Sequence, residues 1–210
     1  MYVPQAFSVE DRAEAIELIR ANPFGTLISV VDGESFVSHL PFTVAQIEPR
    51  IVLAAHCAKA SPHWRHFPES EVRAIFQGEH GYVSPRWYGD PKRDVPTWNY
   101  AVVHCTGTVR LATGTETDAI LRALVDEMET DAAEPWTYDD LDLAYRENMK
   151  QGIVAFYLDV AGMVAKFKLS QNRSQSDRQG AIDGLRETGR ESDRSLADAM
   201  ERCDRSDRSS

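Results

Sequence analysis

Runs of β-branched and alternating apolar residues recur through the first 170 positions of the chain and predict strands. The predicted strands are 24–31, 35–44, 50–56, 72–77, 82–84, 98–111, 153–158 and 163–169. Turn signals separate several of them, namely Asp32-Gly33, the run Gly78 to Gly81, and Ala161-Gly162. Gly107 lies inside the longest predicted strand, where we expect a bulge or a sharp bend.

Apolar residues at a spacing of three to four predict helices in fewer places. Ser8 with Asp11, and Thr115 with Asp118, resemble capping boxes that each precede an apolar stripe. The predicted helices are 9–21, a single turn over 63–67 after Ser61-Pro62, Thr115 through Met128, 139–150, 176–187 and 195–202. In the helix over 139–150 we expect Leu141, Ala144 and Tyr145 to face inward. The segment 85–96 contains three prolines and is expected to be a surface loop.

The order of these elements indicates the fold class. Strands that follow one another through short turns, interrupted by two helices before a final strand pair, predict a β-rich α+β fold built on a closed antiparallel barrel. From position 170 the composition shifts to Arg, Asp, Ser and Gln. We therefore expect a barrel domain over 1–170, a C-terminal helical extension over 171–203 and a disordered tail over 204–210.

Composition narrows the environment in which the protein works. The chain is 42% hydrophobic and 27% charged, and it lacks the run of about 18 apolar residues that a membrane span requires. Its first residues, 1–5, show no export signal, so we expect a cytoplasmic protein. Cys57, Cys105 and Cys203 are odd in number and form no C-x-x-C, which argues against a disulfide framework or a thiolate metal site.

Charge and motifs exclude several functions. The formal net charge is −10, and because DNA affinity comes largely from Lys and Arg contacts to phosphate, direct DNA binding is doubtful. The sequence contains no G-x-S-x-G, P-loop or G-x-G-x-x-G motif. His63 and His66 have the spacing of two metal ligands on one helical face, but no second pair of ligands accompanies them, so we interpret them as structural.

Several segments together resemble the PaiB-like family of FMN-binding negative transcriptional regulators. They are 1–4 (MYVP), 24–29 (FGTLIS), 38–42 (SHLPF), 56–64 (HCAKASPHW), 82–88 (YVSPRWY), 95–100 (VPTWNY) and 166–173 (KFKLSQNR). Their order and spacing extend over about residues 1–200. The resemblance implies a six-stranded split barrel of Greek-key type, FMN as cofactor, a homodimer with cofactor sites at the subunit interface, and a role in repressing transcription. No helix-turn-helix signature is visible.

An FMN site requires a cation for the phosphate, apolar walls for the ring, and hydrogen-bonding groups at the ring edge. On that basis the resemblance suggests these cofactor-binding residues: Thr26, Leu27, Ser38, His39, Leu40, His56, Lys59, Ser61, Trp98, Asn99, Lys168 and Gln171. We place the phosphate near Lys59 and Ser61 and the ring near Trp98. The residues alone favour a plainer interpretation, in which Lys59 is a solvated surface charge, Ser61 a helix cap and Trp98 a core residue. Lys168 could likewise belong to a solvated rim of the barrel.

Three functions remain open at this stage. The first is an FMN-binding regulator, the second an FMN-dependent oxidoreductase of a small molecule, and the third a dimeric binding module with a vacant flavin site. No catalytic acid or base stands out in the sequence.

Overall fold

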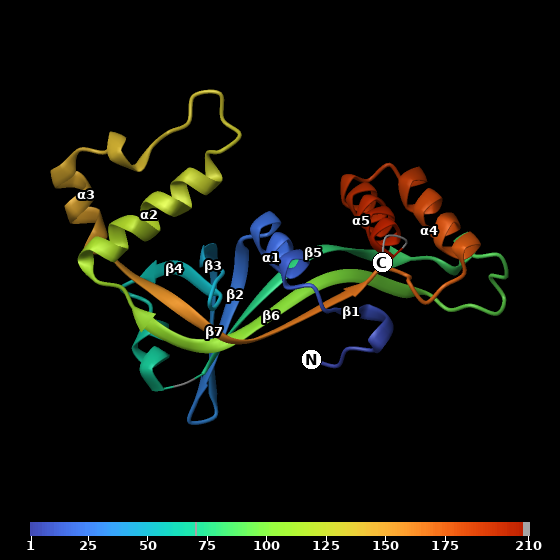
Figure 1. Ribbon diagram of the computed structural model, residues 1–210, viewed down its shortest axis with the longest axis horizontal. Coiled ribbons are helices and arrows are strands. Elements are labelled where there is room, and N and C mark those ends of the chain that lie inside the picture. Colours follow the sequence, from blue (N-terminus) through green and yellow to red (C-terminus); the bar gives the residue numbers. More distant parts are fainter. Residues whose placement is uncertain (70, 208–210) are drawn as a thin grey trace. The chain divides into compact units, whose positions relative to one another are not determined.

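The computed structural model describes residues 1–69 and 71–207 (Figure 1). The strands are β1 (Ser8–Val9), β2 (Phe24–Val31), β3 (Glu34–Gln46), β4 (Val52–Ala58), β5 (Val72–Val83), β6 (Thr97–Leu111) and β7 (Ile153–Lys168). The α-helices are α1 (Arg12–Ala21), α2 (Gly114–Met128), α3 (Leu143–Lys150), α4 (Gln175–Glu187) and α5 (Glu191–Asp207). The described residues also form four 3-10 helices: η1 (Gln5–Phe7), η2 (His63–Glu69), η3 (Pro85–Trp87) and η4 (Tyr138–Asp140).

The strands of the described residues form one sheet in the order β1-β7-β4-β3-β2-β5-β6. An additional pairing of β7 with β6 closes β2 through β7 into a ring, and β1 pairs with β7 outside that ring. The pairings of β2 with β3 and β5, and of β4 with β3 and β7, are antiparallel. The predicted fold class, an antiparallel barrel with peripheral helices, is therefore confirmed.

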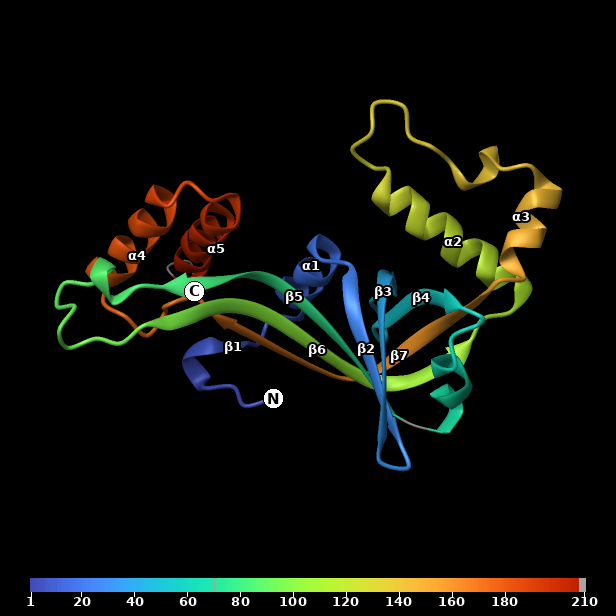
Figure 2. The ribbon, with the colours of Figure 1, turned by 180° about the vertical axis from the view of Figure 1, so that it is seen from behind.

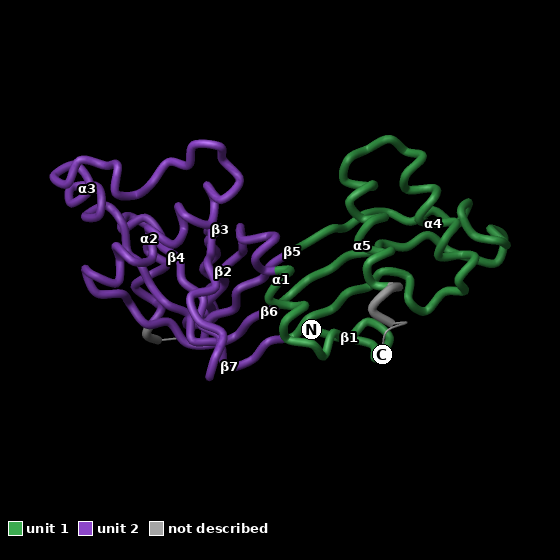
Figure 3. Tube along the Cα trace, turned by 45° about the horizontal axis from the view of Figure 1, so that its top comes forward, with its two compact units in different colours: residues 1–18, 77–103, 164–210 green, residues 19–76, 104–163 purple. Residues whose placement is uncertain are grey.

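The chain divides into two compact units (Figure 3). One, called unit 1 here, comprises residues 1–18, 77–103 and the chain from 164 onward. The other, unit 2, comprises residues 19–76 and 104–163. Strands β5, β6 and β7 each supply residues to both units. The predicted division at residue 170 stays a prediction.

Aromatic side chains fill the core of unit 2. The Phe42 ring meets Phe76 at 5.3 Å and Phe156 at 6.3 Å between centroids, and Phe67 lies 4.9 Å from Phe156. All four rings are fully buried, and burial of one such ring contributes about 2–3 kcal/mol. Because these residues come from β3, β5, η2 and β7, their contact holds η2 against the sheet.

Two helices cover the strands of unit 1. Leu185 of α4 and Leu196 and Met200 of α5 are fully buried, and α4 and α5 lie beside β5 in both views of the ribbon (Figures 1 and 2). A Cβ atom on Gly81 of β5 would lie 2.9 Å from the Leu196 side chain. The glycine therefore permits close packing of α5 on the strand.

That contact explains one wrong prediction. The turn predicted over 78–81 does not exist, because β5 runs unbroken from Val72 to Val83. Likewise, the hairpin predicted at Ala161-Gly162 is wrong, since β7 is a single strand. A Cβ on Gly162 would lie 3.0 Å from Thr106 Oγ1, so this glycine serves a close approach to β6. At Gly107, a Cβ would lie 2.0 Å from the main-chain oxygen of Asp159.

The helix starts are also shifted. Asp11, rather than Ser8, precedes α1 and accepts a bond from Ala13 N, while Ser8 belongs to β1. Helix α2 has its capping box at Thr113 and Glu116 rather than at Thr115 and Asp118. The prediction for α2 relied only on the three-residue spacing of a capping box. The pairs Thr113/Glu116 and Thr115/Asp118 both have this spacing, so the sequence could not distinguish them.

The helix predicted over 139–150 is in fact η4 followed by α3, with Asp142 capping α3 through Tyr145 N. Ala144 and Tyr145 are exposed, contrary to the prediction. The segment predicted as a loop, 85–96, begins with the 3-10 turn η3. Helix α5 begins earlier than predicted and extends to Asp207; positions 208–210 lie outside the described residues. No helix in the described part of the chain has both the length and the apolar character to span a membrane.

Candidate functional site

The five predicted residues of the first two long strands lie together on the β2–β3 hairpin: Thr26, Leu27, Ser38, His39 and Leu40. Asp32 and Gly33 form its turn with positive φ values of 52° and 82°, as the Asp-Gly signal predicts. Thr26 pairs with His39, and Leu27 pairs with Ser38. The predicted adjacency of these strands is confirmed.

Strand alternation divides these residues between two faces of the sheet. Leu27 is fully buried, and Ser38 and Leu40 share its inner face. Thr26 and His39 lie on the outer face, where the His39 ring stacks on Phe24 with centroids 6.4 Å apart. The outer residues can therefore meet a ligand, whereas the inner residues can only support them from behind.

His56 extends this outer face onto β4. The register that pairs Phe42 with Ala55 places His56 beside Pro41, two positions from His39. Burial lowers the pKa of His56, and its Nδ1 atom is buried without a hydrogen-bond partner in the described structure. Buried polar atoms in proteins are nearly always paired, so this nitrogen is a group that a bound ligand could satisfy.

Lys59 and Ser61 follow His56 on the turn between β4 and η2. The main chain of this turn is fixed, because Lys59 N donates to Gly152 O at 2.8 Å and Trp64 Nε1 donates to Lys59 O at 2.9 Å. The Lys59 side chain is exposed and makes no ion pair within the described residues. Ser61 Oγ accepts from His63 N at 3.4 Å, which is the capping role that sequence left open. Because η2 is a 3-10 helix of seven residues, its N-terminus is too short to be the predicted anion site by itself, and Lys59 is the exposed cation of this turn.

His63 anchors η2 to the hairpin, a role that sequence reasoning missed. Its Nε2 lies 2.9 Å from Ser29 Oγ and its Nδ1 lies 2.8 Å from Ser38 Oγ. The ring is 2% exposed, and burial together with the neighbouring His66 lowers its pKa. Ser29 and Ser38 lie 34 and 25 residues before His63, so no local pattern connects them. Within residues 1–69 and 71–207 no three metal-binding side chains cluster.

The remaining four predicted residues belong to unit 1. Trp98 is exposed and stacks on His80 with centroids 6.3 Å apart. Asn99 is fully buried, and its amide donates to Ser170 Oγ at 2.9 Å and to Met200 Sδ at 3.4 Å. Asn99 thereby joins the start of β6 to Ser170, two residues past the end of β7, and to α5.

Lys168 and Gln171 bond mainly to the main chain. Lys168 Nζ donates to Thr97 Oγ1 and, at 2.7 Å, to the Trp98 carbonyl. Burial, then the charges of neighbouring Lys166 and Arg173, lower the Lys168 pKa. The Gln171 amide closes the end of β7 by bonding to main-chain atoms of residues 167 and 169. A flavin contact by any of these four residues stays a prediction.

Comparison with known proteins gives relatives over the whole chain. The "Protease synthase and sporulation protein PAI 2" of Bacillus subtilis is 32% identical over 202 residues, covering 96% of this chain and 97% of that protein. An uncharacterised protein of Emericella nidulans is 28% identical and covers 88% of this chain and 90% of its own length.

Solved structures show the same fold at low sequence identity. The flavocytochrome Anf3 from Azotobacter vinelandii has a TM-score of 0.61 at 16% identity, covering 79% of this chain and 72% of that one. The FAD and heme binding protein from Mycobacterium smegmatis has a TM-score of 0.58 at 17% identity, covering 83% and 79%. The family model described as "Putative FMN-binding domain" matches residues 1–162. The PaiB-like resemblance is thereby confirmed, and this chain belongs to the putative FMN-binding domain family.

Proposed function

We propose that the chain binds FMN as a homodimer and acts as a regulator of transcription. The observation that carries the FMN proposal is the outer face of β2, β3 and β4, along which Thr26, His39 and His56 lead to the exposed ammonium of Lys59. The family and the PaiB-like relative support the same ligand.

The residues of this face fit FMN in chemical type. Lys59 provides a cation for the phosphate, and the Ser61 hydroxyl lies two residues away on the same fixed turn. Thr26, His39 and the unpaired His56 Nδ1 provide hydrogen-bonding groups for the polar edge of the ring. When bound, FMN supplies the redox chemistry of its ring, while these residues orient it.

The same outer face carries the apolar surface that a dimer would cover. Phe24 is 67% exposed, Val30 55% and Val37 53%, and the hairpin register places Ile28 directly across from Val37. Contiguous exposed apolar side chains are typical of protein interfaces rather than of solvated surface. A second copy of this chain is the proposed occupant, because the PaiB-like resemblance implies a homodimer with cofactor sites between the subunits.

Regulation of transcription rests on the resemblance, and the proposal excludes one mode of action. A chain of net charge −10 repels a polyanion on average, so the regulatory effect should not require direct DNA binding by this chain alone. A gel-shift series across salt concentrations tests this. A tight complex that weakens steeply with salt would contradict it.

FMN titration of the purified protein tests the site. Lys59→Ala should weaken FMN about tenfold, the effect of losing one charge-assisted hydrogen bond. Arg65→Ala is the matched control, because Arg65 is a nearby exposed cation whose guanidinium lies over the Trp64 ring. Equal FMN affinity in Lys59→Ala and the wild type would reject the phosphate assignment. Bleaching of bound flavin by NAD(P)H would favour an oxidoreductase over a regulator.

Sedimentation of paired variants tests the interface. Val37→Glu places a charge in the apolar face and should give a monomer with weakened FMN binding. Val95→Glu makes the same change at an exposed position of the 85–96 segment and should leave the dimer intact. A Val37→Glu protein that sediments as the wild type would place the interface elsewhere.

A further inference from the structure

Helix α3 packs within unit 2 by its charged side. Of its eight residues, only Arg146 and Lys150 are partly buried. The Arg146 guanidinium lies 2.8 Å from Asp139 and 5.0 Å from the centre of the Tyr138 ring. Lys150 Nζ lies 2.8 Å from Asp118. A surface helix normally buries an apolar stripe and exposes its polar residues, so α3 is packed in the opposite sense.

The exposed side of α3 is apolar. Tyr145 and Met149 are 55% and 53% exposed, and because they are four residues apart they share one face of the helix. Leu143, in the first turn, is 61% exposed, and Ala144 beside it is also exposed. The sequence predicts that Ala144 and Tyr145 face inward, yet the structure leaves them in contact with solvent. Folding of this chain therefore does not use the apolar residues of α3.

The connection between α2 and α3 also carries exposed apolar side chains. Met128, the last residue of α2, is 52% exposed, and Trp136 is 43% exposed. The main-chain N of Trp136 donates to the Glu129 carboxylate at 3.3 Å. At the start of α3, Asp142 Oδ1 accepts from Tyr145 N at 2.9 Å. Carboxylates therefore lie next to the apolar residues of this part of the chain.

Most of the net charge of the chain comes from the same segment. Residues 126–150 contain nine acidic residues and two basic ones, Arg146 and Lys150, both on the packed side of α3. Asp131 and Glu134 are exposed and form no ion pair among the described residues. No three acidic side chains within residues 1–69 and 71–207 are arranged to hold a metal ion. The segment thus presents apolar side chains in strongly negative surroundings.

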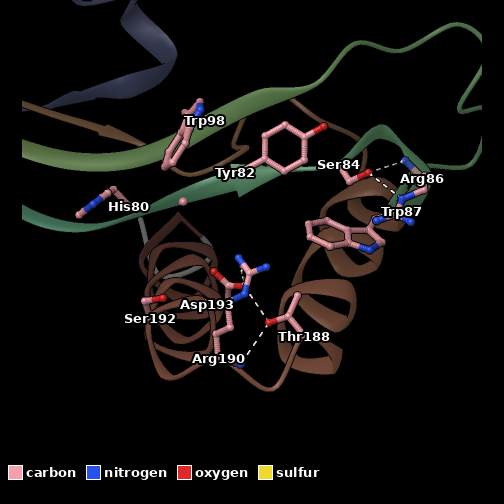
Figure 4. A pocket seen from close by; sticks show the side chains of 11 residues that line it. His80, Tyr82, Ser84, Arg86, Trp87, Trp98, Thr188, Arg190, Ser192 and Asp193 are labelled. Atoms are coloured by element: carbon pink, nitrogen blue, oxygen red, sulfur yellow. Dashed lines mark hydrogen bonds and ion pairs between the residues drawn. The ribbon is translucent and has the colours of Figure 1, made fainter.

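The exposed rings of unit 1 belong to a different arrangement. Figure 4 shows Tyr82 and Trp98 on β5 and β6. The opposite face of these strands carries Gly81 and Asn99 and is covered by α5. Those rings stand on the uncovered face of a sheet whose other face is packed, which is ordinary for an antiparallel sheet. In α3 the covered side is the charged one, so its apolar side requires another explanation.

We propose that the exposed side of α3 docks a basic amphipathic segment of another protein. Apolar side chains of the partner would cover Tyr145 and Met149, and its Lys or Arg side chains would meet the carboxylates of residues 126–150. The charge decides among occupants, because a nucleic acid or an anionic membrane would be repelled, and a second copy would bring the same acidic segment.

The inference goes beyond FMN binding. None of the residues proposed for the flavin lies in the 126–150 segment, so the docking surface does not depend on a bound cofactor. Proteins that bind DNA are rich in Lys and Arg, so a basic partner also suits a regulator that does not contact DNA itself.

Fluorescence anisotropy with a labelled peptide tests the proposal. The probe is a helical peptide of Leu and Lys, about 18 residues long, with its leucines along one face. It should bind the full chain saturably. An analogue with Glu in place of every Lys should not bind, and a scrambled peptide of the same composition should bind at least about tenfold more weakly. Absence of saturable binding by the probe, or equal affinity for either analogue, would overturn the proposal.

Apolar variants assign the binding to α3. Tyr145→Gln and Met149→Gln should each weaken the peptide about tenfold, because each removes a large apolar contact, and Gln preserves helix propensity. Tyr2→Gln is the matched control, since Tyr2 is an exposed tyrosine outside this segment. Circular dichroism verifies folding of each variant. Unchanged affinity in both Tyr145→Gln and Met149→Gln would overturn the assignment.

A charge variant tests the acidic surroundings. Asp131→Asn combined with Glu134→Gln should weaken the peptide about threefold at low salt, and the difference from the wild type should shrink as salt is raised. A loss of affinity that does not change with salt would contradict the charge argument.

Two measurements examine other occupants. Tyr145→Gln and Met149→Gln should sediment as the wild type does, and a shift to monomer would assign this face to a second copy and overturn the proposal. Vesicles of phosphatidylcholine and phosphatidylserine should not bind the wild type. Vesicle binding that is lost in Met149→Gln would assign the face to a membrane, which would also overturn it.

Peptide and FMN titrations of the same variants separate this inference from the proposed function. Lys59→Ala should bind the peptide as the wild type does, and Met149→Gln should keep its FMN affinity. If Lys59→Ala kept FMN, only the flavin assignment would fail. If Tyr145→Gln and Met149→Gln kept the peptide, only the docking surface would fail.

Discussion

Removal of the Ser29 hydroxyl should destabilise the protein more than removal of the Ser38 hydroxyl. Both bond to the same imidazole, at 2.9 Å from Nε2 and 2.8 Å from Nδ1 of His63. A neutral imidazole donates from one nitrogen and accepts at the other, and a serine can serve either role. The two bonds therefore differ mainly in their access to water.

Burial sets the magnitude for each variant. Ser29 is 1% exposed, so Ser29→Ala leaves Nε2 without a partner and out of reach of water, at a cost of about 2 kcal/mol. Ser38 is only partly buried, so water can replace its hydroxyl in Ser38→Ala, and the expected loss is about 0.5–1 kcal/mol. Because η2 follows the Lys59 turn directly, Ser29→Ala should also weaken FMN binding.

Urea unfolding followed by circular dichroism and by tryptophan fluorescence measures these free energies, and coincident transitions show that one value describes each variant. Ser35→Ala is the control, because Ser35 is an exposed serine of β3, the strand that carries Ser38. This variant should change the free energy of unfolding by less than about 0.5 kcal/mol. Equal losses for Ser29→Ala and Ser38→Ala, or a Ser29→Ala protein as stable as the control, would refute the reasoning.

Three further predictions concern packing, pH and thiols. Gly107→Ala should lower the free energy of unfolding in urea by about 3 kcal/mol or more, because the new Cβ would meet a main-chain oxygen. Gly114→Ala is the control and should not destabilise the protein, since nothing lies within 4 Å of a Cβ at that position. Equal stability of the two variants would contradict this prediction. Burial holds the pKa of several histidines, His56 among them, below the usual 6.5, so the folded state binds fewer protons than the unfolded state. The free energy of unfolding should therefore be highest above pH 6.5 and fall as the pH drops below 6.5. Measured between pH 7.5 and 5.5, this fall should be smaller in His56→Leu than in the wild type. Burial raises the pKa of Cys57 to about 11 and of Cys105 to about 12, so neither should react with a thiol reagent until the protein is unfolded, and rapid native labelling of either would show that the core opens.

The β2–β3 hairpin was predictable because its signals are local. The strand over 24–31 has the predicted bounds, and the Asp32-Gly33 turn follows directly from its sequence. Once that turn is fixed, the register brings Thr26 opposite His39 without further information. The position of Lys59 between β4 and η2 could also be predicted from the sequence.

The glycines in the long strands were misinterpreted because their cause lies elsewhere in the chain. Gly81 permits contact with Leu196, and Gly162 permits approach to Thr106. A glycine in a strand pattern signals either a turn or a close approach, and only the partner segment distinguishes the two. The sequence therefore predicted two breaks where β5 and β7 continue.

By itself, the sequence determined the class of fold, the hairpin and the family, since each depends on spacing along the chain. Only the tertiary structure decided which hairpin residues face outward, that Ser29 and Ser38 hold His63, and that Asn99 joins β6 to α5. Those relations connect segments that are distant in sequence. They arise from sheet pairing and helix packing, which minimise exposed apolar surface over the whole chain and leave no periodic trace in any one segment.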